Sequence, residues 1–165
     1  MDIVIRRARE EDLDAAGAVT VEAFVGDGHT APDGEYVHHL RDTRRRAAEA
    51  ELLVAVDPAD RDRVLGCVTF AAGGSAWADI AEPHEGEIRM LAVGRAARGR
   101  GVGEALVRAA TARSRELGLT GMAFSTRPGM TAAHRIYERL GFVRTPSRDW
   151  APRPGIDLMV YSIEL

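Results

Sequence analysis

The sequence predicts an α/β fold, in which a mixed β-sheet lies between layers of helices in a three-layer α-β-α arrangement. The first observation behind this prediction is that apolar runs with the length of strands alternate with runs of helical periodicity. The second is the length of 165 residues, which is enough for one domain with a sizeable core. We therefore expect residues 1–165 to form a single domain.

The first half of the chain predicts four strands and two helices. The arginine-rich centre of the second helix, residues 41–46, is expected to face solvent. Cys67 lies in an apolar run and is expected to be a small core residue. The expected elements, in order, are a strand at 2–8, helices at 12–24 and 35–50, and strands at 51–57, 63–71 and 87–93.

The second half predicts two further helices and three short strands. Gly118 and Gly141 are expected to end the helices in left-handed conformations, and Thr131 is expected to cap the start of the second one. Residues 145–155 are expected to form a loop. The expected elements are a helix at 104–117, a strand at 122–126, a helix at 132–140, and strands at 142–144 and 157–164.

Composition excludes several classes of function. The formal net charge of −3 gives no reason to expect a nucleic-acid partner. One cysteine excludes an intrachain disulfide, and the scattered histidines lack the spacing of metal ligands, so we expect no metal. No leader peptide or long apolar run is visible, so we expect a cytoplasmic protein without a membrane partner.

The glycine-rich turn at 98–103 is the most informative stretch, because a strand precedes it and a helix follows it. Glycines allow positive φ and close approach of the backbone, and the free N–H groups of a helix start attract an anion. Arg98 and Arg100 add positive charge. The turn lacks the Lys-Ser/Thr ending of a nucleoside triphosphate loop and the full G-x-G-x-x-G dinucleotide spacing. The sequence therefore predicts a phosphate site of another kind.

The Arg-x-x-Gly-x-Gly pattern after the strand Glu87–Val93 resembles the coenzyme A pyrophosphate loop of the GNAT superfamily of N-acetyltransferases. The segment Ala132–Phe142 also resembles the A-x-x-x-Y-x-x-x-G-F helix and strand of that superfamily. The resemblance implies a strongly bent mixed sheet whose two central strands splay apart. It also implies acetyl-CoA as acetyl donor and, by family habit, an expected homodimer.

The resemblance implies that the chain transfers an acetyl group from acetyl-CoA to a primary amine of a small molecule or protein, by direct attack in a ternary complex. A non-catalytic acyl-CoA-binding sensor or scaffold is the alternative function. The residues expected to contact coenzyme A are Leu91, Ala92, Val93, Arg98, Gly99, Arg100, Gly101, Val102, Gly103, Thr131 and His134. Among them, Leu91 would offer its backbone N–H to the developing oxyanion at a bulge in the strand.

Acyl transfer to an amine also needs a base for the ammonium and an acid for the leaving thiolate. Tyr137 is the candidate acid, because the resemblance implies a tyrosine near the coenzyme A sulfur at this position. A phenol with a pKa near ~10 protonates a thiolate only slightly uphill, so the step is feasible. The alternative role of Tyr137 is packing in the core. Glu87 opens the strand that the resemblance places beside the acetyl group, so it is the candidate base, and the alternatives are His84, Glu85 or water.

The chain departs from the family pattern at Met130, where many members have an asparagine that contacts the pantetheine. Arg127 or the Thr131 hydroxyl is expected to replace that contact. The acceptor is expected to enter between two loops, residues 25–36 and 145–155. Acids would favour an ammonium-rich acceptor, whereas Arg148 would favour a carboxylate. The polar or aromatic loop residues are Asp27, His29, Asp33, Glu35, Tyr36, Arg148, Asp149 and Trp150.

Overall fold

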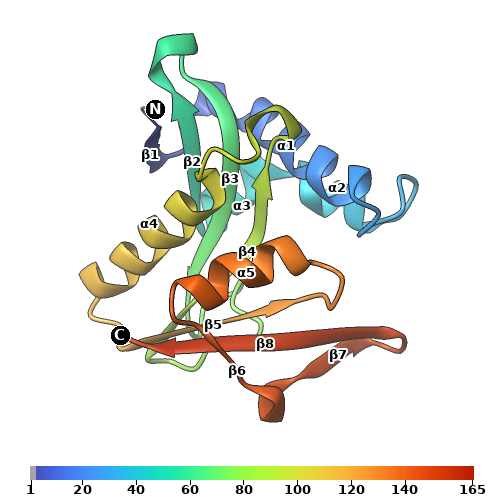
Figure 1. Ribbon diagram of the computed structural model, residues 1–165, viewed down its shortest axis with the longest axis vertical. Coiled ribbons are helices and arrows are strands. Elements are labelled where there is room, and N and C mark those ends of the chain that lie inside the picture. Colours follow the sequence, from blue (N-terminus) through green and yellow to red (C-terminus); the bar gives the residue numbers. More distant parts are fainter. Residues whose placement is uncertain (1–2) are drawn as a thin grey trace.

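The computed structural model describes residues 3–165 and contains one bent, mixed sheet with helices on both faces (Figure 1). The strand order is β1-β2-β3-β4-β5-β8-β6, and β7 pairs with β8 outside this path. The expected strand at 2–8 starts at a residue outside the described part of the chain. The strands are β1 (Val4–Arg7), β2 (Glu51–Asp57), β3 (Arg63–Ala72), β4 (Glu85–Val93), β5 (Gly121–Thr126), β6 (Val143–Arg144), β7 (Trp150–Arg153) and β8 (Ile156–Glu164).

The splay of the two central strands creates the opening that matters for function. Strands β4 and β5 are parallel, and they pair only at Glu85 with Gly121 and at Gly86 with Met122. Beyond these residues β4 turns away, so it rises steeply from the β5–β8 pair in Figure 1. All other strand pairs are antiparallel. The splayed central sheet expected from the resemblance is therefore confirmed.

Two apolar clusters hold helices on opposite faces of the sheet. One cluster joins Leu106 of α4 (Val102–Glu116) and Tyr137 of α5 (Thr131–Arg139) to strand residues such as Phe124. The other joins Leu13 and Ala16 of α1 to the opposite face. The three-layer arrangement predicted from the sequence is confirmed. The helices are α1 (Leu13–Gly26), α2 (Tyr36–Arg41), α3 (Thr43–Glu49), α4 (Val102–Glu116) and α5 (Thr131–Arg139).

Several element boundaries differ from the expectation. The helix expected at 35–50 is two helices, because Asp42 leaves helical geometry and its side chain caps the Arg45 N–H of α3. Thr131 is the first residue of α5 and gives no cap, since the capping position is Met130. The loop expected at 145–155 contains a short 3₁₀ helix and strand β7. Gly118 and Gly141 do adopt the expected positive φ.

Arg46 corrects the prediction that residues 41–46 face solvent, because its side chain is completely buried. One guanidinium nitrogen contacts the sulfur of Met90, and another lies 3.5 Å from the Thr20 hydroxyl. Its Nε has no hydrogen-bond partner among the described residues, and no carboxylate there forms an ion pair with it. Burial lowers the pKa of this guanidinium. Cys67, beside Thr20, is buried as expected.

Replacing Arg46 with methionine is expected to stabilise the fold by roughly 1–4 kcal/mol, because an apolar side chain of similar length removes a buried cation that no carboxylate balances. Chemical denaturation would measure the free energy of unfolding. The matched control is Arg45→Met, since Arg45 is exposed and forms only a surface ion pair with Glu49. A less stable Arg46→Met protein would contradict this account and show that the guanidinium contacts outweigh its desolvation.

Candidate active site

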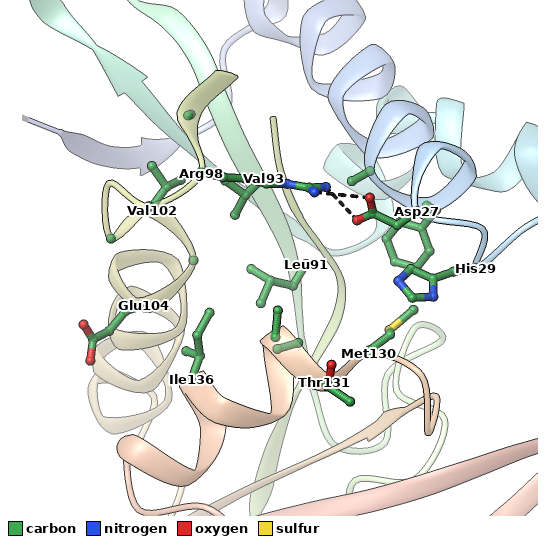
Figure 2. Close-up of a pocket in the computed structure, with 18 of the residues that line it drawn as sticks. Asp27, His29, Leu91, Val93, Arg98, Val102, Glu104, Met130, Thr131 and Ile136 are labelled. Atoms are coloured by element: carbon green, nitrogen blue, oxygen red, sulfur yellow. Dashed lines mark hydrogen bonds and ion pairs between the residues drawn. The ribbon is translucent and has the colours of Figure 1, made fainter. Parts of the chain in front are cut away.

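Two cavities meet where β4 leaves β5. The first cavity, of about 540 Å³, lies between the end of α1, the second half of β4, the turn 98–103 and the starts of α4 and α5 (Figure 2). The second, of about 290 Å³, is bounded by β4, β5, the β7–β8 hairpin and α5. Phe24, Leu91, Met130 and Ala133 line both cavities. A molecule that fills the first cavity can therefore present one end to the second.

The turn 98–103 forms one end of the first cavity and has the geometry of an anion cradle. Gly99 and Gly101 have φ of +78° and +77°, and a Cβ built on either would meet nothing within 4 Å. No side chain of the described residues caps the start of α4, so its first N–H groups face the open turn. Gly103 is packed instead, since its Cβ would lie 2.9 Å from Ile136 of α5.

Arg98 reaches across this cavity to Asp27 at the end of α1, as Figure 2 shows. Its two terminal nitrogens lie 2.6 and 3.2 Å from the carboxylate oxygens of Asp27. This pair corrects the expectation that Asp27 faces the acceptor. Arg100 lies outside the cavity lining, and its guanidinium is 3.4 Å from Asp57 of β2.

The bulge expected at Leu91 is present in β4. Pairing with β3 shifts between Cys67–Ala92 and Thr69–Arg89, which leaves Met90 and Leu91 outside the register. Met90 has a φ of +55°, an unusual conformation for a side chain of this size. Such outliers persist where the surrounding structure fixes them, often at functional sites. The bulge places Leu91 on the shared wall of the two cavities.

Glu87 lies on the second cavity and is almost completely buried. Its Oε1 accepts hydrogen bonds of 2.9 Å from the backbone N–H groups of Ile80 and Ala81. Burial raises the pKa of this carboxyl, and these bonds oppose the rise only in part. A carboxylate with a raised pKa beside a cavity is typical of a general base.

The alternatives to Glu87 do not reach this cavity. Glu85 is buried in a two-fold ion pair with Arg148, at 2.9 and 3.1 Å, which holds the pKa of Glu85 below its usual range against the effect of burial. His84 is exposed and lines neither cavity. The ion pair also corrects the expectation that Arg148 binds a substrate carboxylate, because its partner is a residue of the chain itself.

Tyr137 is buried among aromatic rings and also lines the second cavity. The centroid of its ring lies 4.2 Å from that of Phe124 and 5.8 Å from that of Tyr161. Its hydroxyl makes no hydrogen bond to a described residue, and burial raises the pKa of Tyr137 well above its ordinary value. The Tyr137 ring thus packs in the core and also borders the second cavity.

The remaining residues that were expected to contact coenzyme A fall into three groups. Thr131, Val93 and Val102 line the first cavity. His134 lines neither cavity, because its Nε2 lies 3.0 Å from the Arg127 carbonyl and 3.2 Å from the Thr126 hydroxyl. Ala92 faces the α1 side of the sheet, so only its backbone can serve the site.

Sequence reasoning missed several residues of the second cavity. Phe24 belongs to α1, and Arg89 to β4, and neither showed a local pattern beyond its secondary structure. Trp150, which the sequence placed in an acceptor loop, does line the cavity and donates a hydrogen bond of 2.8 Å to Ser125. Tyr36 of the other acceptor loop lines it as well. The exposed acids Asp33 and Glu35 do not.

Residues 3–165 contain no cluster of three histidine, cysteine or acidic side chains arranged to hold a metal ion. None of their helices combines the length and apolar character needed to cross a membrane.

Residues 7–142 match the sequence profile of the acetyltransferase (GNAT) family. The mycothiol acetyltransferase of Nocardia farcinica (strain IFM 10152) is 36% identical over 149 aligned residues, and the match covers 86% of this chain and 46% of that protein. The chain thus spans about half the length of this relative.

Solved structures have the same fold. An acetyltransferase of the GNAT family from Staphylococcus aureus Mu50 superposes with a TM-score of 0.75 at 13% identity, covering 99% of both chains. The PaiA N-acetyltransferase of Thermoplasma acidophilum, in complex with coenzyme A, superposes with a TM-score of 0.72 at 16% identity over 100% of both chains.

Proposed function

The chain belongs to the acetyltransferase (GNAT) family, and from this premise we propose that it transfers an acetyl group from acetyl-CoA to a primary amine at the junction of its two cavities. The first cavity would hold coenzyme A and the second would hold the amine. The observation that carries this proposal is the shared wall at Leu91, where the strand bulge meets both cavities.

The first cavity fits the cofactor for reasons that this chain itself provides. The uncapped start of α4 and the open Gly99 and Gly101 offer backbone N–H groups to a pyrophosphate. Arg98 lies beside this cradle, and both of its terminal nitrogens are paired with Asp27, so the backbone N–H groups are the free donors to the pyrophosphate. Bound acetyl-CoA would supply the acetyl group as an activated thioester. Thr131 is the polar side chain beside Met130 that can replace the usual asparagine contact.

At the junction, three groups of this chain take separate roles. Leu91 lies at the bulge, outside the register of the β3–β4 pair, and its backbone N–H is assigned to stabilise the oxyanion. Glu87 is assigned to take the proton of the amine, directly or through water, because burial raises its pKa toward neutral pH, where a general base works best. Tyr137 stays protonated, so its hydroxyl is assigned to donate to the leaving sulfur.

The test of this function is release of free thiol from acetyl-CoA in the presence of a panel of primary amines. We expect amine-dependent release, with the acetylated amine formed in equal amount. Tight binding of acetyl-CoA without release, for every amine in the panel, would instead support a non-catalytic sensor or scaffold.

Replacing Gly101 with aspartate is expected to weaken acetyl-CoA binding at least ~10-fold, about 1.4 kcal/mol, measured by titration calorimetry. The new carboxylate would occupy the cradle and repel the pyrophosphate. Gly118→Asp is the matched control, because Gly118 has nearly the same φ of +75° and open surroundings but lies at the other end of α4. Equal affinities for a folded Gly101→Asp protein and the control would place the pyrophosphate elsewhere.

A further inference from the structure

We propose that the acceptor carries a carboxylate beside its amine and an apolar side chain, as a small amino acid does. This inference rests on the proposed function and concerns the second cavity. It comes from the charges that remain there once each ion pair and hydrogen bond of the described residues has been assigned.

Of the two acids that line the second cavity, only one is paired with a cation. Asp79 forms an ion pair with Arg89 at 3.5 Å, and Arg89 also stacks on Trp77 with its guanidinium carbon 5.3 Å from the ring centre. Glu87 is the other acid, and it receives two backbone N–H groups in a buried position. Glu87, the assigned base, is therefore the one acid of the lining that has no cationic partner among the described residues.

Two of the three arginines that line the cavity form no ion pair with a described residue, against one unpaired acid. Arg127 of the lining donates to the backbone carbonyl of His29, which carries no net charge. Arg153, at the end of β7, lines the cavity and forms no ion pair with any residue in the range 3–165. Arg46 lies behind Met90, which lines the cavity; it contacts the Met90 sulfur and forms no ion pair with an acid among residues 3–165.

An excess of guanidinium groups in a cleft raises the local potential and attracts anions. Arginine also binds a carboxylate through two parallel N–H groups, which orients the bound molecule. The cavity volume of about 290 Å³ suits a small molecule. Its apolar lining suits an apolar side chain, and it includes Phe24, Trp150, Pro152, Ile156 and Leu158.

The experiment compares leucine with leucinamide, which share the side chain and the amine and differ in the carboxylate. Values of kcat/KM are compared at equal concentrations of unprotonated amine, because the two amines titrate differently. We expect leucine to be at least ~10-fold better. Arg153→Gln should lower kcat/KM for leucine roughly five- to ten-fold, through KM, and change that for leucinamide less than about two-fold. The matched control is Arg115→Gln, since Arg115 is exposed on α4 and lines neither cavity.

The outcomes separate this inference from the proposed function. Equal use of the two substrates, or an equal effect of Arg153→Gln on both, would overturn the inference and leave acetyl transfer intact. Turnover of a polyamine such as spermidine, with leucine inert, would do the same. If no amine released thiol, the proposed function would fail. The affinities of N-acetylleucine and N-acetylleucinamide for the complex of the protein with coenzyme A would then test the carboxylate preference. Equal affinities would overturn the inference.

Discussion

Replacing Glu87 with glutamine should lower kcat/KM by roughly 10²-fold at neutral pH, which is the lower range for loss of a positioned general base. Glutamine keeps an oxygen that accepts the N–H groups of Ile80 and Ala81, so the local structure should survive. Burial raises the pKa of Glu87. The ionised form, which accepts the proton, therefore appears at a higher pH than it would for a glutamate with an ordinary pKa.

The pH profile of kcat/KM measures this directly. The wild type should show an acidic limb that Glu87→Gln flattens or moves, and the defect should shrink at high pH as more amine is unprotonated. Glu85→Gln is the matched control, because Glu85 lies two residues away on β4 but pairs with Arg148 outside the cavity. An equal loss at every pH would assign Glu87 a positioning role, and unchanged activity would leave water as the acceptor of the proton.

Replacing Tyr137 with phenylalanine should lower kcat roughly 10²-fold and leave acetyl-CoA binding little changed. The hydroxyl has no hydrogen bond to a described residue, so its loss should not cost stability. The structure corrects one part of the sequence argument. Because burial raises the pKa of Tyr137, proton transfer to the thiolate is more uphill than for an ordinary phenol, and the hydroxyl helps most as charge develops on the sulfur.

Tyr161→Phe is the matched control for this variant. Tyr161 belongs to the same aromatic group and lines neither cavity, and its hydroxyl donates to Glu138 at 3.2 Å. In single-turnover measurements, Tyr161→Phe should react like the wild type. A normal single-turnover rate for Tyr137→Phe would show that Tyr137 serves packing only. The raised pKa also predicts that ionisation of Tyr137 causes no loss of wild-type activity below about pH 10.

The parts of the site that the sequence predicted are local in the chain. The turn 98–103 needs only its glycines and its flanking strand and helix, and Gly99 and Gly101 adopt the positive φ that such a turn requires. The end of β4 at Val93 and the end of α4 just before Gly118 are set by periodicity and by a helix stop in the same way, whereas β4 begins two residues earlier than expected, at Glu85. These features could be read from neighbouring residues alone.

The parts that the sequence could not predict depend on residues far apart. Arg148 pairs with Glu85, which lies 63 residues away in the sequence, and Arg98 pairs with Asp27, which lies 71 residues away. Both arginines were expected to be available for a ligand, and both form ion pairs within the chain. Arg46 looked like one of a run of surface arginines, but α3 turns it beneath the bulge of β4. Only the packed fold tells which charges remain for a substrate.

Initial rates of thiol release, with acetyl-CoA and the amine varied together, test the central claim most directly. Two cavities that meet at Leu91 allow both substrates to be bound at once, and no nucleophile of the chain is needed to carry the acetyl group. We therefore predict double-reciprocal plots that intersect, as direct transfer in a ternary complex requires. Parallel lines, with exchange of the acetyl group in the absence of amine, would contradict the account.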